Sequence, residues 1–256
     1  MDLPHNPFKE AILAGRQQIG LWCMLPGSFV TEALAGAGYD WLLLDTEHSP
    51  ADVLDVLPQL QAAAAYDVSA IVRPAANDPV LIKRFLDIGA QSLLIPYVQS
   101  VEEAEAAVAA VRYPPAGIRG VAGSTRAARF GKIKDYTKLA ADELCLIVQV
   151  ETRTALDEIE AIAAVDGVDG IFVGPFDLAL TRGRSTYAFS GTDRADISHL
   201  AAAARAAGKP WWMPAWRPEE QRFALDHGAS VRIVAAEHQL LQAGLAKVLS
   251  DLPDDR

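Results

Sequence analysis

The chain has 256 residues, of which 51% are hydrophobic and 22% charged, and its formal net charge is −10 at pH 7. This composition is ordinary for a globular enzyme, and the negative charge argues against general nucleic-acid binding, which requires clustered Lys and Arg. No apolar stretch reaches the roughly 18 residues that a membrane span needs. We therefore expect one domain over residues 1–256, with no membrane and no nucleic-acid partner.

The start of the chain and the cysteines favour a cytoplasmic protein. The segment Met1–His5 lacks the basic-then-apolar order of a signal peptide. Cys23 and Cys145 lie inside apolar runs and show no CxxC spacing, so we expect buried thiols rather than a zinc site or a disulfide.

Short apolar runs alternate with helical stretches along the chain. The runs are Ile19–Met24, Trp41–Leu44, Ser69–Val72, Ser92–Pro96, Leu144–Val150, Gly170–Val173, Pro210–Met213 and Val231–Ala235. The helical stretches are Phe29–Ala37, Ala51–Ala65, Pro79–Ile88, Val101–Val111, Ala155–Val165, Asp196–Ala207, Pro218–Asp226 and Leu240–Leu249. About eight such alternations predict an α/β fold of the (β/α)8 TIM-barrel type. A doubly wound open sheet is the alternative.

Polar and charged residues gather directly after the predicted strands. Asp45, Thr46, Glu47 and His48 follow the second strand, Arg73 the third, Gln149 and Glu151 the fifth, and Asp177 the sixth. Irregular stretches over 113–136, 181–192 and 213–217 lie near strand ends as well. Barrel active sites are built at the carboxyl ends of strands, so we expect these groups to form one site.

Two carboxylates stand out in this set. Glu151 and Asp177 follow neighbouring strands, and two converging acids usually need a cation or a shared proton. Carboxylate oxygens suit Mg²⁺ or Mn²⁺, which keep several coordination positions for water or substrate. A metal site is our leading hypothesis; an acid pair neutralised by Arg73 is the alternative.

His48 and Arg73 are the expected base and cation of the site. His48 has the chemistry of a general base oriented by a neighbouring carboxylate, and Asp45 is the nearest candidate. Arg73 suits binding of a carboxylate or of a developing oxyanion. A loop histidine with a local hydrogen bond, and an arginine that only neutralises Glu47 or Glu151, are the structural alternatives.

Weaker signals surround this set. Gly174-Pro175-Phe176 offers backbone N–H groups of Gly174 and Phe176 to a substrate carboxylate, although a plain turn explains it too. Trp212 and Trp216 flank a strand end and belong either to a pocket or to packing. No lysine follows a strand, which disfavours Schiff-base chemistry. No Walker sequence and no GxGxxG after a strand are present, so nucleotide cofactors are not expected.

Several segments in the same order resemble the HpcH/HpaI aldolase family of metal-dependent pyruvate aldolases. They are Gly38–His48, Arg73-Pro74 with Asn77-Asp78, Asp87–Gln91, Pro96–Ser100, Tyr113–Pro115 with Gly117–Gly120, Gln149–Thr152 and Gly174–Leu178. The resemblance implies a TIM barrel whose C-terminal helix is exchanged between protomers, usually in a hexamer. It also implies a divalent ion, Mg²⁺, Mn²⁺ or Co²⁺.

The resemblance assigns roles to individual residues. Glu151 and Asp177 would bind the metal, Arg73 the keto oxygen of the substrate, and His48 with Asp45 would form the base dyad. Gln149 would support the metal ligands, and Asp87 would reach the site of a neighbouring subunit. The role of Asp87 rests on the resemblance alone.

The implied reaction joins a 2-oxo acid, pyruvate or hydroxypyruvate, to an aldehyde, or cleaves the product. Oxaloacetate-type decarboxylation, CoA-ester cleavage at the same metal site, and a non-catalytic 2-oxo acid binding module are the alternatives. Beyond Leu180 the resemblance weakens, because Trp211–Trp216 and Glu237-His238 replace the aliphatic strand and the Asp-containing turn common in the family. We expect Trp212 and Trp216 to line the acceptor pocket, and Glu237-His238 to have a minor role at its rim.

Overall fold

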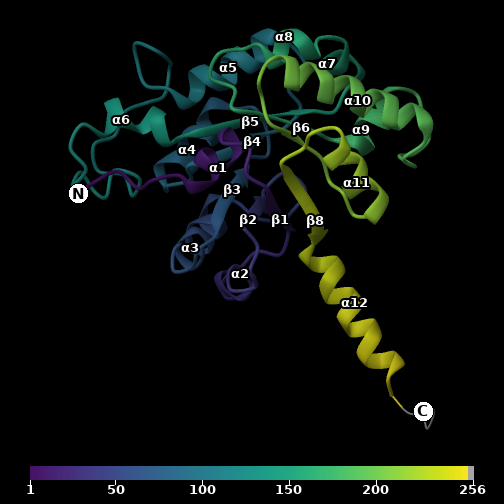
Figure 1. Cartoon of the computed structure of the whole chain (residues 1–256). Helices are drawn as coiled ribbons and strands as arrows, with labels where there is room; N and C mark the ends of the chain where they lie inside the picture. Colours follow the sequence, from purple (N-terminus) through teal and green to yellow (C-terminus); the bar gives the residue numbers. More distant parts are fainter. Residues whose placement is uncertain (253–256) are drawn as a thin grey trace.

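The computed structural model describes residues 1–252, and in this part eight parallel strands form one sheet (Figure 1). The strands are β1 (Gln18–Cys23), β2 (Trp41–Asp45), β3 (Ser69–Arg73), β4 (Ser92–Ile95), β5 (Cys145–Val150), β6 (Gly170–Val173), β7 (Trp211–Trp212) and β8 (Val231–Ala236). Their order is β7-β6-β5-β4-β3-β2-β1-β8. A parallel bridge from Pro214 to Ile233 brings the two edges together. The predicted TIM barrel is confirmed.

Helices follow the strands and cover the outside of the barrel (Figure 1). They are α1 (Pro7–Leu13), α2 (Ser28–Ala35), α3 (Val53–Ala63), α4 (Pro79–Asp87), α5 (Val101–Val111), α6 (Tyr136–Glu143), α7 (Arg153–Asp157), α8 (Ile159–Ala163), α9 (Pro175–Thr181), α10 (Gly191–Ala206), α11 (Pro218–Asp226) and α12 (Glu237–Ser250). Three of them, α1, α6 and α9, lie outside the helical stretches expected from the sequence. None of the helices over residues 1–252 has the length and apolar character that crossing a membrane requires.

Aromatic side chains fill the inside of the barrel. Trp41, Phe172 and Trp212 are each 1% exposed and pack with Phe8 of α1, which closes the amino-terminal end. Glycine makes this filling possible, because a Cβ at Gly20 would lie 2.1 Å from Cε2 of Trp41. Trp212 therefore belongs to the barrel interior.

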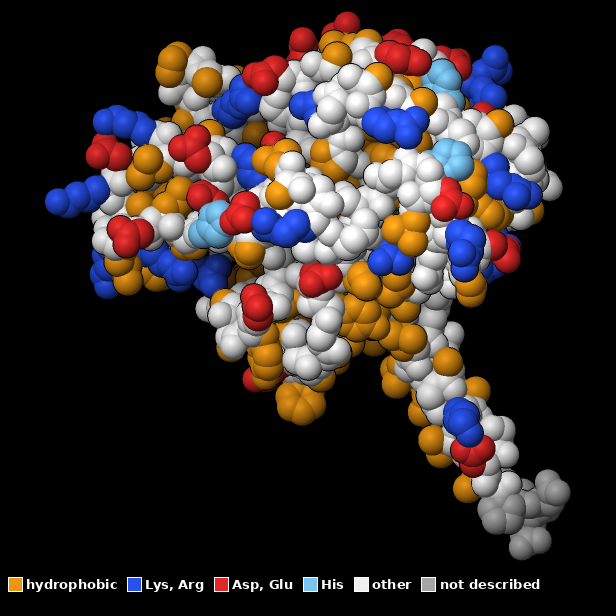
Figure 2. Space-filling model, viewed as in Figure 1, with side chains coloured by type: hydrophobic (Ala, Val, Ile, Leu, Met, Phe, Trp, Pro, Cys, Tyr) orange, Lys and Arg blue, Asp and Glu red, His pale blue; other side chains and the backbone are white. Residues whose placement is uncertain are grey.

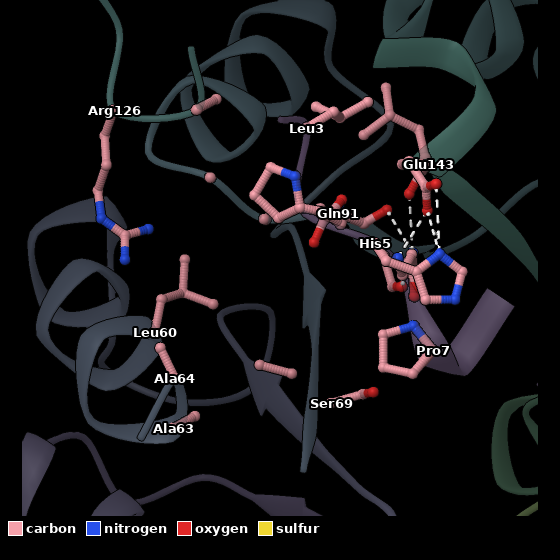
Figure 3. Close-up of a pocket in the computed structure, with 18 of the residues that line it drawn as sticks. Leu3, His5, Pro7, Leu60, Ala63, Ala64, Ser69, Gln91, Arg126 and Glu143 are labelled. Atoms are coloured by element: carbon pink, nitrogen blue, oxygen red, sulfur yellow. Dashed lines mark hydrogen bonds and ion pairs between the residues drawn. The ribbon is translucent and has the colours of Figure 1, made fainter. Parts of the chain in front are cut away.

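A cavity of about 320 Å³ lies at the amino-terminal end of the strands, beside the segment 3–7 (Figure 3). The groups along it bond to one another. Asn6 Nδ2 donates to Ser92 Oγ at 3.0 Å, and Gln91 Nε2 donates to the Pro4 carbonyl oxygen at 2.7 Å. His5 contacts Glu143 (Figure 3). These bonds attach the N-terminal segment beneath the barrel, the end of this fold where residues stabilise rather than react.

The last helix, α12, projects away from the barrel (Figure 1). Its leucines are exposed to an extent unusual for a globular protein, with Leu241 at 54% and Leu245 at 57%. Figure 2 shows hydrophobic side chains along this projecting helix and on the body around the point where it leaves. The remaining large apolar residues exposed on the helix are Leu240, Val248 and Leu249. Within residues 1–252, these apolar side chains are exposed rather than packed against the barrel.

Candidate active site

A buried ion pair joins the ends of β2 and β3. The strand register places Asp45 opposite Arg73. Arg73 donates from Nε to Asp45 Oδ1 at 2.9 Å and from Nη2 to Oδ2 at 2.6 Å. Both side chains are 3% exposed or less. Burial raises the pKa of Asp45, but the hydrogen bonds and the charge of Arg73 outweigh it and hold that pKa below its usual value. The carboxylate is therefore ionised.

Trp22, on β1, holds this pair from a third side. Its indole Nε1–H donates to Asp45 Oδ2 at 3.1 Å, and its ring lies 4.4 Å from Cζ of Arg73. Stacking on an aromatic face and a fork of hydrogen bonds fix a guanidinium in one orientation. Trp22 lies in an apolar run that is typical of a barrel core, so the sequence around it gives no sign of this contact.

A chain of hydrogen bonds links Arg73 to the carboxylate of Glu151. Arg73 Nη1 donates to Gln149 Oε1 at 3.4 Å, and Gln149 Nε2 donates to Glu151 Oε2. The other oxygen, Oε1, accepts the backbone N–H of Tyr97 at 2.9 Å. Tyr97 has a φ of 57°, a left-handed conformation that is uncommon outside glycine. The backbone after β4 is thus bent so that its N–H points at Glu151.

Burial first, together with the charges of Glu47 and Asp177, raises the pKa of Glu151 to about 7 against the opposing hydrogen bonds from Gln149 and from the Tyr97 backbone. Glu47 has a raised pKa as well, again through burial first, although its Oε2 lies 2.8 Å from Arg73 Nη1. Asp45 and Glu47 both pair with the single guanidinium of Arg73, and Glu151 and Asp177 add two more carboxyl groups to the same region of the barrel. A bound cation would offset the negative charge of such a cluster.

Asp177 lies in the first turn of α9, directly after β6 and Gly174. Together with Glu151 it lines a cavity of about 240 Å³ at the carboxyl ends of the strands. The predicted gathering of Arg73, Gln149, Glu151 and Asp177 at one place is therefore found in the structure. Further residues along this cavity are Trp22, His48, Phe172, Pro175, Phe176, Trp216 and His238.

Gly174 contributes space rather than a hydrogen-bond donor. Its backbone N–H donates to the Val150 carbonyl oxygen at 3.0 Å, because the residue continues the pairing of β6 with β5, so it is not free for a substrate carboxylate. A Cβ at this position would lie 2.6 Å from Oε2 of Glu151 and 3.2 Å from Nε2 of Gln149. Only glycine lets the loop approach this carboxylate so closely.

His48 lies at the rim of the cavity, with a side chain 64% exposed. Its nearest acid is Glu47, whose Oε1 is 3.9 Å from Nε2. The expected pairing of the imidazole with Asp45 is not formed here, because Arg73 and Trp22 occupy the Asp45 oxygens. Asp45 contacts His48 through the backbone instead, where the His48 N–H donates to Asp45 Oδ1 at 3.5 Å.

Residues 18–222 match the profile of a family described as HpcH/HpaI aldolase/citrate lyase. The chain belongs to this family. It is 65% identical over 183 residues, 72% of each chain, to a pyruvate aldolase of Rhizobium etli. It is 60% identical over the same length and coverage to a hydroxypyruvate/pyruvate aldolase of Sagittula stellata. A solved HpcH/HpaI aldolase/citrate lyase family protein of Burkholderia cenocepacia superposes with a TM-score of 0.92 at 37% identity, over 96% of this chain and 98% of the other.

Family membership makes the chain an aldolase, a carbon–carbon lyase. Its cavity at the carboxyl ends of the strands is the site that can serve this chemistry. Asp87, which the family resemblance assigns to a neighbouring subunit's site, lies at the end of α4 and outside this cavity. Its Oδ1 accepts a hydrogen bond from the buried Arg119 at 2.9 Å.

The two tryptophans expected in the acceptor pocket are separated. Trp216 lines the aldolase cavity, whereas Trp212 fills the barrel interior below Phe172. At the start of α12, His238 lines the cavity, and the buried Glu237 accepts the backbone N–H groups of Met24 and Leu25 with Oε1. Glu237 therefore fixes the loop after β1.

Proposed function

We propose that this aldolase is metal-dependent and uses a 2-oxo acid, pyruvate or hydroxypyruvate, as the donor that adds to an aldehyde. The observation that carries the proposal is the meeting of Glu151, Asp177, Gln149 and Arg73 in one cavity. Carboxylates beside a fixed guanidinium suit a small anion chelated to a cation. The names of the two bacterial relatives, a pyruvate and a hydroxypyruvate/pyruvate aldolase, support the choice of donor.

The donor set fits Mg²⁺, Mn²⁺ or Co²⁺. Within residues 1–252, no group of three or more His, Cys, Asp or Glu side chains is arranged around an ion position. Glu151 and Asp177 would therefore hold the ion as a pair, and oxygens of substrate and water would complete its coordination. Mg²⁺ is commonly bound in this way, by one or two carboxylates. The charge excess around Glu151 supports the assignment.

The protein residues would divide the work on the donor. A bound divalent ion supplies a positive charge that acidifies the C–H bond next to the keto group. Arg73, fixed by Asp45 and Trp22, would stabilise the negative charge that develops on the keto oxygen. Gln149 would keep Glu151 oriented, as partners of metal ligands commonly do. The turn at Pro175 and Phe176 would lie against the donor carboxylate.

His48 would act as the base that removes the donor proton. Its exposure at the rim leaves the imidazole free to take a proton and release it to water. In this arrangement Asp45 supports the base only indirectly, by holding Arg73 and the backbone of residues 47 and 48.

The experiment that tests the donor reaction is proton NMR of pyruvate in D₂O with the enzyme and Mg²⁺ or Mn²⁺. We expect the methyl signal to disappear, and EDTA to stop its loss. Glu151→Gln and Asp177→Asn should abolish both the exchange and the metal binding measured by calorimetry. His48→Ala should retain metal binding and lose roughly 10²- to 10⁴-fold in exchange rate. Undiminished metal affinity in both carboxylate variants would refute the ligand assignment.

We also propose that protomers exchange α12 in a homo-oligomer, a hexamer as the family resemblance implies. The exposed apolar residues along the projecting helix support this, since Leu241 and Leu245 are each more than half exposed. Large contiguous apolar surfaces on soluble proteins mark interaction sites. Sedimentation velocity on the full chain tests the proposal, with a monomer at micromolar concentration as the contradicting result.

A further inference from the structure

We propose that His238 is a second proton-transferring residue of this site, and that it protonates the oxygen of the aldehyde as the new carbon–carbon bond forms. The inference rests on the proposed donor reaction and adds a catalytic residue to the step that follows it. His238 comes directly after β8, at the start of α12. It lines the cavity that also holds Arg73 and Glu151.

The addition step produces a negative charge that needs a proton. The carbon of the donor enolate bonds to the carbonyl carbon of the aldehyde, and one electron pair of the C=O double bond moves to the aldehyde oxygen. That oxygen takes a proton and becomes the hydroxyl of the product. A positioned side chain that supplies such a proton commonly contributes about 10²- to 10⁴-fold in rate.

Most titratable side chains along the cavity already have another role. In the part of the chain that the structure describes, they are His48, Arg73, Glu151, Asp177 and His238. The two carboxylates are the proposed metal ligands, and a guanidinium does not give up its proton in proteins. His48 holds the proton of the donor during the addition. His238 is therefore the residue that is free to give one to the aldehyde.

The imidazole of His238 has one buried edge. Its Nδ1 is buried and lies 3.9 Å from Oε2 of Glu237, and that carboxylate is 3% exposed. Among residues 1–252, neither of these two atoms has a hydrogen-bond partner. The His238 side chain as a whole is 35% exposed, so its accessible part lies away from Nδ1. The Nε2 side of the ring is thus the one that a substrate in the cavity can meet.

Glu237 is fixed in the position that supports a protonated imidazole. Its Oε1 accepts the backbone N–H groups of Met24 and Leu25, which hold the carboxylate against the loop after β1. Its Oε2 is left beside Nδ1 of His238. A neighbouring carboxylate favours the charged form of a histidine and orients its ring. The imidazolium can then give its Nε2 proton to the aldehyde oxygen, and the neutral ring regains a proton from water.

His48 and His238 enter the cavity from opposite sides of β1. In the sheet, β1 lies between β2 and β8, and its residue Trp22 is paired with Ala236 at the end of β8. His48 follows β2, and His238 follows Ala236 closely. A base and an acid on two sides of one cavity can each act once, without a single residue carrying the proton across it.

The test separates the two halves of the reaction. Exchange of the pyruvate methyl protons in D₂O needs only the donor half, whereas addition of pyruvate to acetaldehyde needs both. Each rate is measured with Mg²⁺ for the wild type, His238→Ala and His238→Gln, because glutamine can donate a hydrogen bond but cannot give up a proton. We expect both variants to lose about 10²- to 10⁴-fold in kcat for addition. Their loss in exchange rate should be much smaller.

His199→Gln is the matched control, because this histidine lies on α10, outside the cavity, with a side chain 51% exposed. It should change neither rate. Equal losses of both rates in folded His238 variants would overturn the proposal, and so would wild-type addition by His238→Gln.

If neither His238 variant folds, Glu237→Gln tests the same pair, since it removes the charge beside Nδ1 and keeps an oxygen for the loop. It should lower addition more than exchange, and equal effects on the two rates would overturn the proposal. An absence of pyruvate exchange in the wild type is a different failure, because it refutes the donor reaction itself.

Discussion

Gly174→Ala places a single methyl group against the proposed metal site. The backbone at Gly174 has φ −92° and ψ 88°, which alanine adopts without left-handed strain. The added Cβ would lie 2.6 Å from Glu151 Oε2, whereas ordinary contact begins at 3.4 Å. It would lie 2.7 Å from Glu151 Cβ, so rotation of the carboxylate alone does not relieve the clash. Glu151 must move by 0.8 Å or more, the difference between 3.4 and 2.6 Å.

A shift of this size has a predictable cost. Misplacing a catalytic group by about 1 Å commonly reduces rate about 10²-fold, and disturbing the support of a metal ligand reduces affinity about 10- to 100-fold. Overpacking costs about 1–3 kcal/mol of stability. We therefore expect a folded Gly174→Ala protein whose Kd for Mn²⁺, measured by calorimetry, rises about 10- to 100-fold. The pyruvate exchange rate should fall by about 10²-fold.

Gly191→Ala is the matched control, because a Cβ there meets nothing within 4 Å. It should change neither Mn²⁺ binding nor exchange. If Gly174→Ala binds Mn²⁺ as the wild type does and exchanges pyruvate at the same rate, then Glu151 is not a ligand whose position matters, and the reasoning fails.

Three further predictions concern other parts of the molecule. Trp22→Phe keeps a ring beside the guanidinium but removes the hydrogen bond to Asp45, so urea unfolding should show about 1.5–3 kcal/mol less stability at neutral pH; unchanged stability would contradict it. Leu245→Glu puts a charge on the exposed face of α12 and should reduce the mass found by light scattering, whereas an unchanged mass would count against helix exchange. Hydrogen bonds that the His5 ring donates to Glu10 and, to a lesser extent, to Glu143 raise the pKa of His5, so Glu10→Gln should bring the pKa measured by NMR back towards its usual value. Because this pKa is raised on folding, the stabilisation by charged His5 is complete below pH 6.5 and is lost as pH rises through the folded-state pKa. A stability difference between wild type and Glu10→Gln that does not change with pH would contradict this prediction.

The barrel was predictable because each strand is a short apolar run that can be recognised in the sequence without knowledge of distant contacts. The run Trp41–Leu44 appears as a strand one residue longer, ending on Asp45. Helices that form because of contacts with distant residues had no such local pattern. Helix α1 has only seven residues and forms where Phe8 closes the barrel end, and α9 begins at Gly174-Pro175, which reads equally well as a turn. The predicted helix over Ala155–Val165 is interrupted at Glu158, which no periodicity indicated.

The site was predictable in its members and less so in its contacts. Each strand end places its polar residue at the same face, so Arg73, Glu151 and Asp177 were found together. Sequence proximity suggested that Asp45 pairs with His48, but strand register puts Arg73 directly opposite Asp45. The Asp45 carboxylate therefore pairs with the Arg73 guanidinium and not with the His48 imidazole. Register between strands is set by the whole sheet and leaves no local signal.

The strands around the cavity are not paired to the same extent, and the pairing is least extensive between β7 and β8. Five residue pairs join β2 to β3, from Trp41 opposite Ser69 to Asp45 opposite Arg73. By contrast, β7 has only two residues, and a single bridge at Pro214 joins its continuation to β8. Residues 213–217 therefore lie at the junction with the fewest strand hydrogen bonds, and Pro214 and Trp216 among them line the cavity. Substitutions in this segment should reshape the cavity while Arg73, Gln149 and Glu151 keep their places on the paired strands.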